Sequence, residues 1–262
     1  MKLCIIVTLA LSVSLQSRTC LALAARGTSL EQEATPQKAQ KGDEITKLLE
    51  RIKSQSPAER REAIDQLGDA GDSRAVLPLI AALKDQDPDV RASTANALGQ
   101  LGDKRAIEPL TSMLNDEVSF VRAASARVLG QLGDARAVDA LTGALRDGNS
   151  TVRGAAAMGL GSLKDARAVQ ALIPALRDEA PDVRAAVAAA LGDLHDKRGV
   201  GPLVQSLKDD YRMVKLASAL ALADIGDKSA AAALNDAVVA EKDEETRSQM
   251  KEALKRLMAA PD

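Results

Sequence analysis

Residues 72–102 read DSRAVLPLIAALKDQDPDVRASTANALGQLG, and the same phrase begins again at Asp103, Asp134, Asp165, Asp196 and Asp227. Each of these aspartates lies 31 residues after the one before it. Leucines keep the same step from Leu79 to Leu234. A fixed period of this length indicates one supersecondary unit per repeat, which buries its apolar face only by stacking on its neighbours. The sequence therefore predicts an elongated solenoid.

Each repeat is predicted to contain two antiparallel helices. Asp72 is a suitable N-cap for a first helix, whose apolar residues Val76, Leu79 and Leu83 keep helical spacing. A tight turn follows at residues 85–87, and Asp87 then caps a second helix with Pro88 in its first position. Gly102 stands where a helix ends in a left-handed residue. The fold class is therefore all-α.

Counting the period outward extends the array to about seven two-helix units over residues 41–258. The last predicted helix carries Lys251, Glu252, Lys255 and Arg256 and is far more charged than its predecessors. A polar terminal unit is what a solenoid needs to end in water. We therefore expect one continuous repeat domain with a C-terminal cap.

The repeated phrases Gly-Asp-x-Arg-Ala-Val, Asp-Pro-Asp-Val-Arg and Ala-Leu-Gly-x-Leu-Gly resemble the short HEAT-like repeat of the phycobilisome-lyase type over about residues 41–258. The resemblance implies an α-α superhelix. The 31-residue period is shorter than the roughly 40–47 residues usual for HEAT repeats. Folds of this kind serve many roles, so the resemblance indicates the architecture and leaves the ligand open.

Residues 1–24 have the features of a secretory signal peptide. Lys2 precedes an apolar run over residues 3–15, and Ala22-Leu23-Ala24 forms a small-residue cleavage site. The mature protein is then expected to begin near Ala25 and to be periplasmic or secreted from a bacterium, without a membrane span. An uncleaved N-terminal anchor and a lipidated Cys20 are the alternatives. Residues 25–40 are polar, lack an apolar period and are expected to form a disordered linker.

Composition argues against several classes of function. Both cysteines, Cys4 and Cys20, lie in the predicted signal peptide, so cleavage would remove disulfides, thiolate catalysis and cysteine-ligated metals together. Net charge is −2 with interspersed signs, and Phe120 and Tyr211 are the only aromatic residues, which disfavours nucleic-acid binding. His195 is the only histidine and is predicted to lie in a turn. We expect no catalytic, cofactor-binding or metal-binding residues.

Two enzyme groups share the resemblance and form the alternative function. Deoxyhypusine hydroxylase-like proteins carry His-Glu pairs just after the repeat arginine, where they hold a di-iron centre. The matching positions here hold no histidine, as Ala92-Ser93 and Ala123-Ala124 show. Without imidazoles such an iron site is not expected. Bilin lyases act on cytosolic phycobiliproteins, which an exported chain would not meet. The chain is therefore predicted to be no enzyme.

Five acid–base pairs recur in register, with each base six residues after its acid. They are Asp85 and Arg91, Asp116 and Arg122, Asp147 and Arg153, Asp178 and Arg184, and Asp209 and Lys215. The resemblance implies that they form a ladder between successive inter-helix turns, with Asp147 as the partner of Arg153. A row of anion or metal sites is the alternative. Glycines at Gly99, Gly130, Gly161 and Gly192 further indicate close approach between neighbouring helices.

The resemblance places the second helices on the concave side of the solenoid. Their predicted exposed face carries an apolar strip, with polar residues along one edge. The strip is expected to dock an extended or helical segment of another protein through Ala155, Met158, Ala189 and Leu220, oriented by Arg127, Asp193 and Asp224. The alternative is that these small residues only pack against the next repeat. The sequence therefore predicts a non-enzymatic protein-interaction scaffold.

Overall fold

The computed structural model describes residues 36–260, and every regular element in that range is a helix. The chain divides into two units, residues 1–41 and 42–262. The predicted signal peptide, and the predicted linker as far as residue 35, lie outside the described residues. Helix α1 (Pro36–Arg51) begins before the predicted repeat start at residue 41. Residues 36–40 of the predicted linker belong to this helix, and the linker itself stays a prediction.

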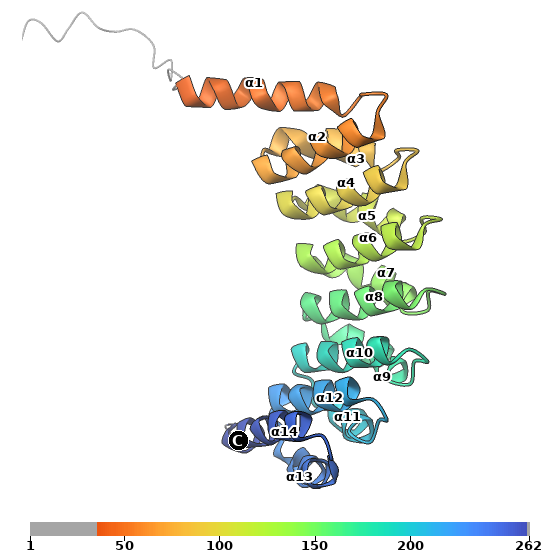
Figure 1. The fold of residues 1–262 in the computed structure, drawn as a ribbon, viewed down its shortest axis with the longest axis vertical. Helices are drawn as coiled ribbons and strands as arrows, with labels where there is room; N and C mark the ends of the chain where they lie inside the picture. The colour runs from red at the N-terminus through yellow and green to blue at the C-terminus, as the bar shows by residue number, and fades with distance from the viewer. Residues whose placement is uncertain (1–35, 261–262) are drawn as a thin grey trace, which may run out of the picture. The chain divides into compact units, whose positions relative to one another are not determined.

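Within residues 36–260, fourteen α-helices form seven pairs, which confirms the predicted all-α superhelix of two-helix units (Figure 1). The first helices after α1 are α3 (Val76–Ala82), α5 (Ile107–Met113), α7 (Val138–Ala144), α9 (Val169–Ala175), α11 (Val200–Ser206) and α13 (Ala231–Ala240). The second helices are α2 (Pro57–Ala70), α4 (Pro88–Leu101), α6 (Ser119–Leu132), α8 (Ser150–Leu163), α10 (Pro181–Asp193), α12 (Arg212–Ile225) and α14 (Glu244–Ala259).

A short 3₁₀ turn precedes each first helix after α1. The sequence analysis did not predict these turns. Asp72 caps the turn η1 (Ser73–Ala75), where its carboxylate accepts a hydrogen bond from the Arg74 N–H at 2.9 Å. The corresponding turns are η2 (Lys104–Ala106), η3 (Ala135–Ala137), η4 (Ala166–Ala168), η5 (Lys197–Gly199) and η6 (Lys228–Ala230). The second helix behaves as predicted, because Asp87 caps α4, Pro88 is its first residue and Gly102 ends it at φ 67°.

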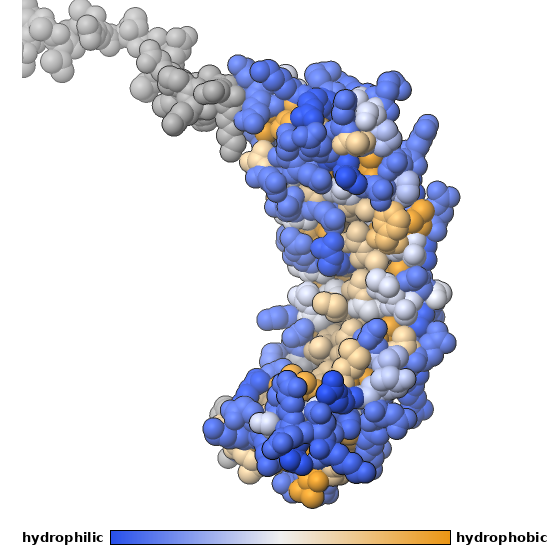
Figure 2. Space-filling model, viewed as in Figure 1, coloured by the Kyte–Doolittle hydropathy of each residue, from blue (hydrophilic) through white to orange (hydrophobic). Residues whose placement is uncertain are grey.

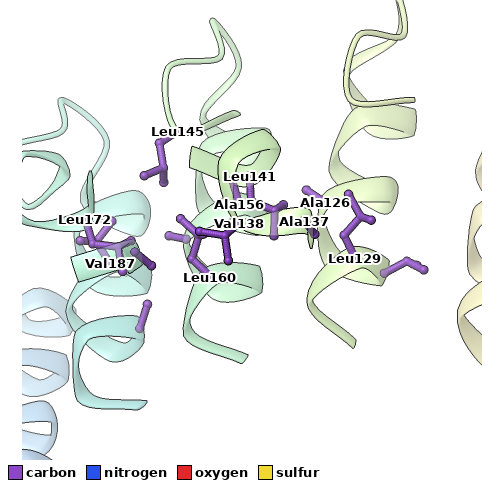
Figure 3. Close-up of a cluster of buried hydrophobic side chains, with 14 of the residues drawn as sticks. Ala126, Leu129, Ala137, Val138, Leu141, Leu145, Ala156, Leu160, Leu172 and Val187 are labelled. Carbon is purple, nitrogen blue, oxygen red and sulfur yellow. The ribbon is translucent and has the colours of Figure 1, made fainter. Parts of the chain in front are cut away.

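The core lies between the helix layers. Each second helix from α2 to α12 packs on the next second helix, and each first helix from α3 onward packs on the second helix of its own pair. Leu129, Leu141, Leu160 and Leu172 lie in this core and are fully buried (Figure 3). Each such leucine contributes roughly 1.5–3 kcal/mol through removal of its side chain from water. Stacking therefore supplies the stability that a single pair lacks.

Glycines set the spacing between neighbouring second helices, as their register predicts. A methyl group added to Gly130 of α6 would lie under 3.0 Å from the backbone of Gly159 in α8. One added to Gly161 would lie 2.8 Å from the Ala190 Cα of α10. Gly154 in α8 differs, because an added methyl group there would meet nothing within 4 Å. The contact between α6 and α8 therefore depends on two glycine backbones that touch directly.

Candidate functional site

The exposed side of α4, α6, α8, α10 and α12, called here the second-helix face, carries an apolar patch. Met158 of α8 is 59% exposed, Phe120 of α6 is 46% exposed and Leu220 of α12 is 37% exposed. Figure 2 shows tan and orange surface across the middle repeats and mostly blue surface over the repeats at both ends. Monomeric soluble proteins seldom expose contiguous apolar surface without a use for it. The apolar surface in this view lies mainly over the middle of the array.

A groove of 530 Å³ crosses the second-helix face over α6, α8 and α10. Its lining includes the predicted partner-binding residues Arg127, Ala155 and Met158. The other lining residues are Phe120, Ala123, Ala124, Ser150, Thr151, Gly154, Asp182, Val183 and Ala186. Ala189 and Leu220 lie exposed on α10 and α12, outside this lining. The structure thus brings three of the predicted residues into one groove.

Phe120 and Asp182 belong to the groove and were missed by the sequence reasoning. Both stand one residue before the repeat valine, at Val121 and Val183. That position was not counted as part of the face. Phe120 is the only phenylalanine of the chain, and an aromatic side chain at a position that holds Asp89 and Thr151 in neighbouring repeats was a visible signal.

The groove carries one positive and one negative side chain that no described ion pair neutralises. Arg127 is exposed on α6 and donates a hydrogen bond from Nη2 to the neutral Asn96 Oδ1 at 2.8 Å. Asp182 is exposed in the first turn of α10. Neither forms a salt bridge among residues 43–260. The two charges therefore remain available to a bound molecule, one on each outer helix of the groove.

Asp193 and Asp224, predicted to orient a partner, lie at the C-terminal ends of α10 and α12, away from the groove lining. The Asp224 carboxylate accepts a hydrogen bond from Arg256 Nη2 at 2.6 Å. The backbone oxygen of Asp224 lies 2.7 Å from His195 Nδ1. His195 has φ 48° and occupies a turn, as predicted. Asp224 is therefore engaged within the protein, and an orienting role for it and for Asp193 stays a prediction.

The in-register acids and bases form a ladder that joins neighbouring repeats. Arg153 donates from Nε and Nη2 to the two carboxylate oxygens of Asp178 at 2.7 and 2.8 Å. Its Nη1 donates to the backbone oxygen of Asp147 at 2.8 Å. The predicted side-chain pair of Arg153 with Asp147 is therefore wrong, since the Asp147 carboxylate binds Arg122. The same geometry recurs for Arg91 with Asp116, and for Arg184 with Asp209.

The ladder changes at both ends of the array. At the N-terminal end it has a further rung that the predicted set omits, because Arg60 donates to Asp85 at 2.6 and 2.7 Å. At the C-terminal end Lys215 replaces the arginine and binds the Glu241 carboxylate, not the predicted Asp209. Lysine donates from one nitrogen and cannot reproduce the planar fork of a guanidinium. The last rung is therefore chemically simpler than the others.

A second ladder follows the 3₁₀ turns. Arg136 binds the carboxylate of Asp134, and the hydrogen bonds from its side chain and its N–H hold the pKa of Asp134 at about 2. Arg167 also donates from Nη2 to the backbone oxygen of Ala135 in the preceding repeat at 3.1 Å. Arg198 and Ala166 repeat this bond at 3.0 Å. The motif Asp-x-Arg therefore links repeats as well as capping turns.

Acidification is expected to destabilise the array between about pH 4 and pH 2. Hydrogen bonds from Arg122 lower the pKa of Asp147 against the opposing effect of burial, and the pKa of Asp134 and of Asp196 is about 2. A carboxyl whose pKa is lower folded than unfolded gives stability that is complete above the unfolded value, 3.8, and is lost as pH falls through the folded value. Melting temperatures measured from pH 6 to pH 2 by circular dichroism test this. A melting temperature that stays constant down to pH 2 would contradict it.

No group of three or more His, Cys, Asp or Glu side chains among residues 36–260 is arranged to hold a metal ion. No helix in the described part of the chain is long and apolar enough to cross a membrane. Asp178 and Asp134, like most aspartates of the two ladders, bind arginines, and Asp227 lies 3.8 Å from Lys197 Nζ. The groove on the second-helix face is the pocket that contains residues predicted from the sequence to bind a partner.

Comparisons with solved structures show similar folds. The complex of CpcE and CpcF of phycocyanin lyase from Nostoc sp. PCC7120 matches with a TM-score of 0.55 and 24% identity, over 81% of this chain and 94% of that chain. YibA of Escherichia coli matches with a TM-score of 0.60 and 22% identity, over 82% of each chain. Kap95p, solved bound to RanGDP, matches with a TM-score of 0.65 and 14% identity, over 83% of this chain and 36% of that chain.

A search of curated proteins found no match. The sequence profile of HEAT repeats matches residues 45–129, 119–180 and 169–255, which together cover nearly all of the predicted repeat domain. The chain therefore belongs to the HEAT-repeat family.

Proposed function

We propose that this protein is a non-enzymatic scaffold that binds a segment of another protein on its second-helix face. The observation that carries the proposal is the 530 Å³ groove across α6, α8 and α10, with Phe120 and Met158 exposed in its lining. A preformed concave surface limits the ordering cost of binding, because its walls are already fixed by repeat packing. Met158 can adapt its shape to a partner.

Two further observations support a binding role. The aspartates that could perform acid–base chemistry in the ladders are engaged with arginines, which favours a structural role for them. Among proteins of similar fold, CpcE forms a complex with CpcF and Kap95p binds RanGDP. The fold is thus used elsewhere to hold protein partners, and we extend that use to this chain.

Replacing Met158 and Leu220 together with glutamate is expected to abolish partner capture. An apolar segment that entered the patch would remove water from the two carboxylates. This desolvation costs roughly several kcal/mol per charge. Both side chains are exposed in the free protein, so helicity and melting temperature should stay near the wild-type values. The measurement is crosslinking and co-purification from the producing cells, with circular dichroism of the free variant.

A matched control is available on the first helices. Leu77 of α3 and Val239 of α13 are 62% and 76% exposed, and replacing both with glutamate changes charge equally but leaves the second-helix face intact. This control variant should retain every partner. If the Met158 and Leu220 variant retains the same partners as well, the groove is not the binding site and the proposal fails.

We also propose that the protein is exported and begins near Ala25, because the apolar run over residues 3–15 and Ala22-Leu23-Ala24 have the pattern of a signal peptide. The intact mass of protein recovered from the periplasm or medium should lack residues 1–24. A mass that retains Met1 to Ala24 would contradict cleavage and favour an N-terminal anchor.

A further inference from the structure

We infer that the occupant of the groove is an amphipathic α-helix of another protein. The small apolar stripe of this partner helix lies on α6, α8 and α10. One acidic side chain of the partner helix faces Arg127, and one basic side chain faces Asp182. This inference rests on the proposed function and describes the partner segment more closely. It identifies the conformation and the charge pattern of the bound segment.

The floor of the groove favours a helix over an extended peptide. Ala123, Ala124, Ala155 and Ala186 form much of the floor and lie inside α6, α8 and α10, whose backbone N–H and C=O groups bond along their own helices. An extended segment would bring unpaired N–H and C=O groups onto methyl groups, and each such group left unpaired is costly. A helix satisfies these groups internally and presents only side chains.

The polar side chains of the lining are too few to replace missing backbone partners. They are Arg127, Ser150, Thr151 and Asp182. The Thr151 N–H already bonds to Asn149 Oδ1 at 2.9 Å. Ser150 and Thr151 begin α8, so they lie toward one margin of the groove. The small floor residues instead allow a helix to approach closely, as Gly130 and Gly159 allow between α6 and α8.

The length and the charges of the groove define the segment. Neighbouring helices pack about 8–10 Å apart, so the path from α6 to α10 is about 20 Å long. At 1.5 Å per residue this corresponds to about 13 residues of α-helix. Arg127 on α6 and Asp182 on α10 carry opposite charges that lack ionic partners in the described part of the chain, so a complementary helix places opposite charges near its two ends.

The test begins with a photoreactive benzoylphenylalanine in place of Met158 in the full chain. Ultraviolet light crosslinks it to its neighbours in the producing cells, and mass spectrometry identifies the crosslinked peptide. The same probe in place of Met258 of α14, which is 56% exposed against 59% for Met158, is the matched control outside the groove. The peptide captured only at position 158 is then synthesised for binding to the purified full chain.

We expect the synthetic segment to gain helicity on binding, measured by circular dichroism. Arg127→Glu should weaken its affinity about tenfold, and exchanging the facing acid of the segment for arginine should restore it. Arg61→Glu on α2, a charge reversal at another exposed arginine, should leave affinity unchanged. A segment that binds without gaining helicity, or is indifferent to Arg127→Glu, overturns this inference alone. A probe at position 158 that captures no peptide overturns the proposed function with it.

Discussion

Gly130→Ala is expected to destabilise the array by about 3 kcal/mol, the upper end of the usual cost of overpacking. The new methyl group would lie under 3.0 Å from the Cα of Gly159 and 3.1 Å from its backbone oxygen. No side chain can rotate away from this clash, because the opposing atoms are backbone. Relief therefore requires α6 and α8 to move apart, which loosens the packing on both sides. Chemical denaturation followed by circular dichroism gives the shift in midpoint.

Gly154→Ala is the matched control for this substitution. It makes the same change in the neighbouring second helix, at a position where the added methyl group meets nothing within 4 Å. Alanine is favoured over glycine inside a helix by up to about 1 kcal/mol, so this variant should be as stable as the wild type or more stable. Equal losses of stability in the two variants would show that direct contact between Gly130 and Gly159 does not set the helix spacing.

Arg153→Ala is expected to cost about 3 kcal/mol, because it leaves a partly buried carboxylate without its partner. The side chain of Asp178 is 11% exposed and takes two hydrogen bonds from Arg153. The substitution also removes the donor to the backbone oxygen of Asp147. Lys255→Ala, at a side chain that is 79% exposed, should change stability by no more than about 0.5 kcal/mol. The measurement is again the denaturation midpoint.

Double variants separate the two possible partners of Arg153. Adding Asp178→Ala to Arg153→Ala removes the stranded charge and should recover part of the lost stability. Adding Asp147→Ala to Arg153→Ala should instead lower stability further, since it removes the two hydrogen bonds that Asp147 accepts from Arg122. Recovery with Asp147→Ala in place of Asp178→Ala would contradict the pairing between repeats.

The fold could be predicted from the sequence because the same helical pattern recurs every 31 residues. Asp87, Pro88 and Gly102 define the ends of α4 by local backbone chemistry, and single residues of this set recur later, as Pro181 at the start of α10 and Gly133 at the end of α6. The ladder partners could not be predicted in the same way. Each ladder arginine from Arg91 to Arg184 has one aspartate six residues before it and another 25 residues after it. Periodicity alone cannot tell which of the two the side chain reaches.

The candidate site was predicted only where its residues follow the counted positions. Met158 and Ala155 were found because their positions within the repeat, six and three residues after the repeat valine, lie at the centre of the second-helix face. Phe120 and Asp182 lie in the first turns of α6 and α10, where side chains point back toward the start of the helix and reach the groove margin. Asp193 and Asp224 were included by register, but the groove does not extend to the C-terminal ends of the helices that carry them.

The simpler rung at the last junction has a consequence for how the array opens. Repeats that contact only their neighbours behave as a one-dimensional chain of couplings, and local opening starts where a coupling is weakest. Each earlier junction is fastened by a guanidinium that bonds both a carboxylate and a backbone oxygen, whereas Lys215 gives the last one a single ammonium bonded to Glu241. We therefore expect the α13–α14 pair to open at a lower free energy than the pairs between α3 and α12, so that unfolding within the array starts at its C-terminal end.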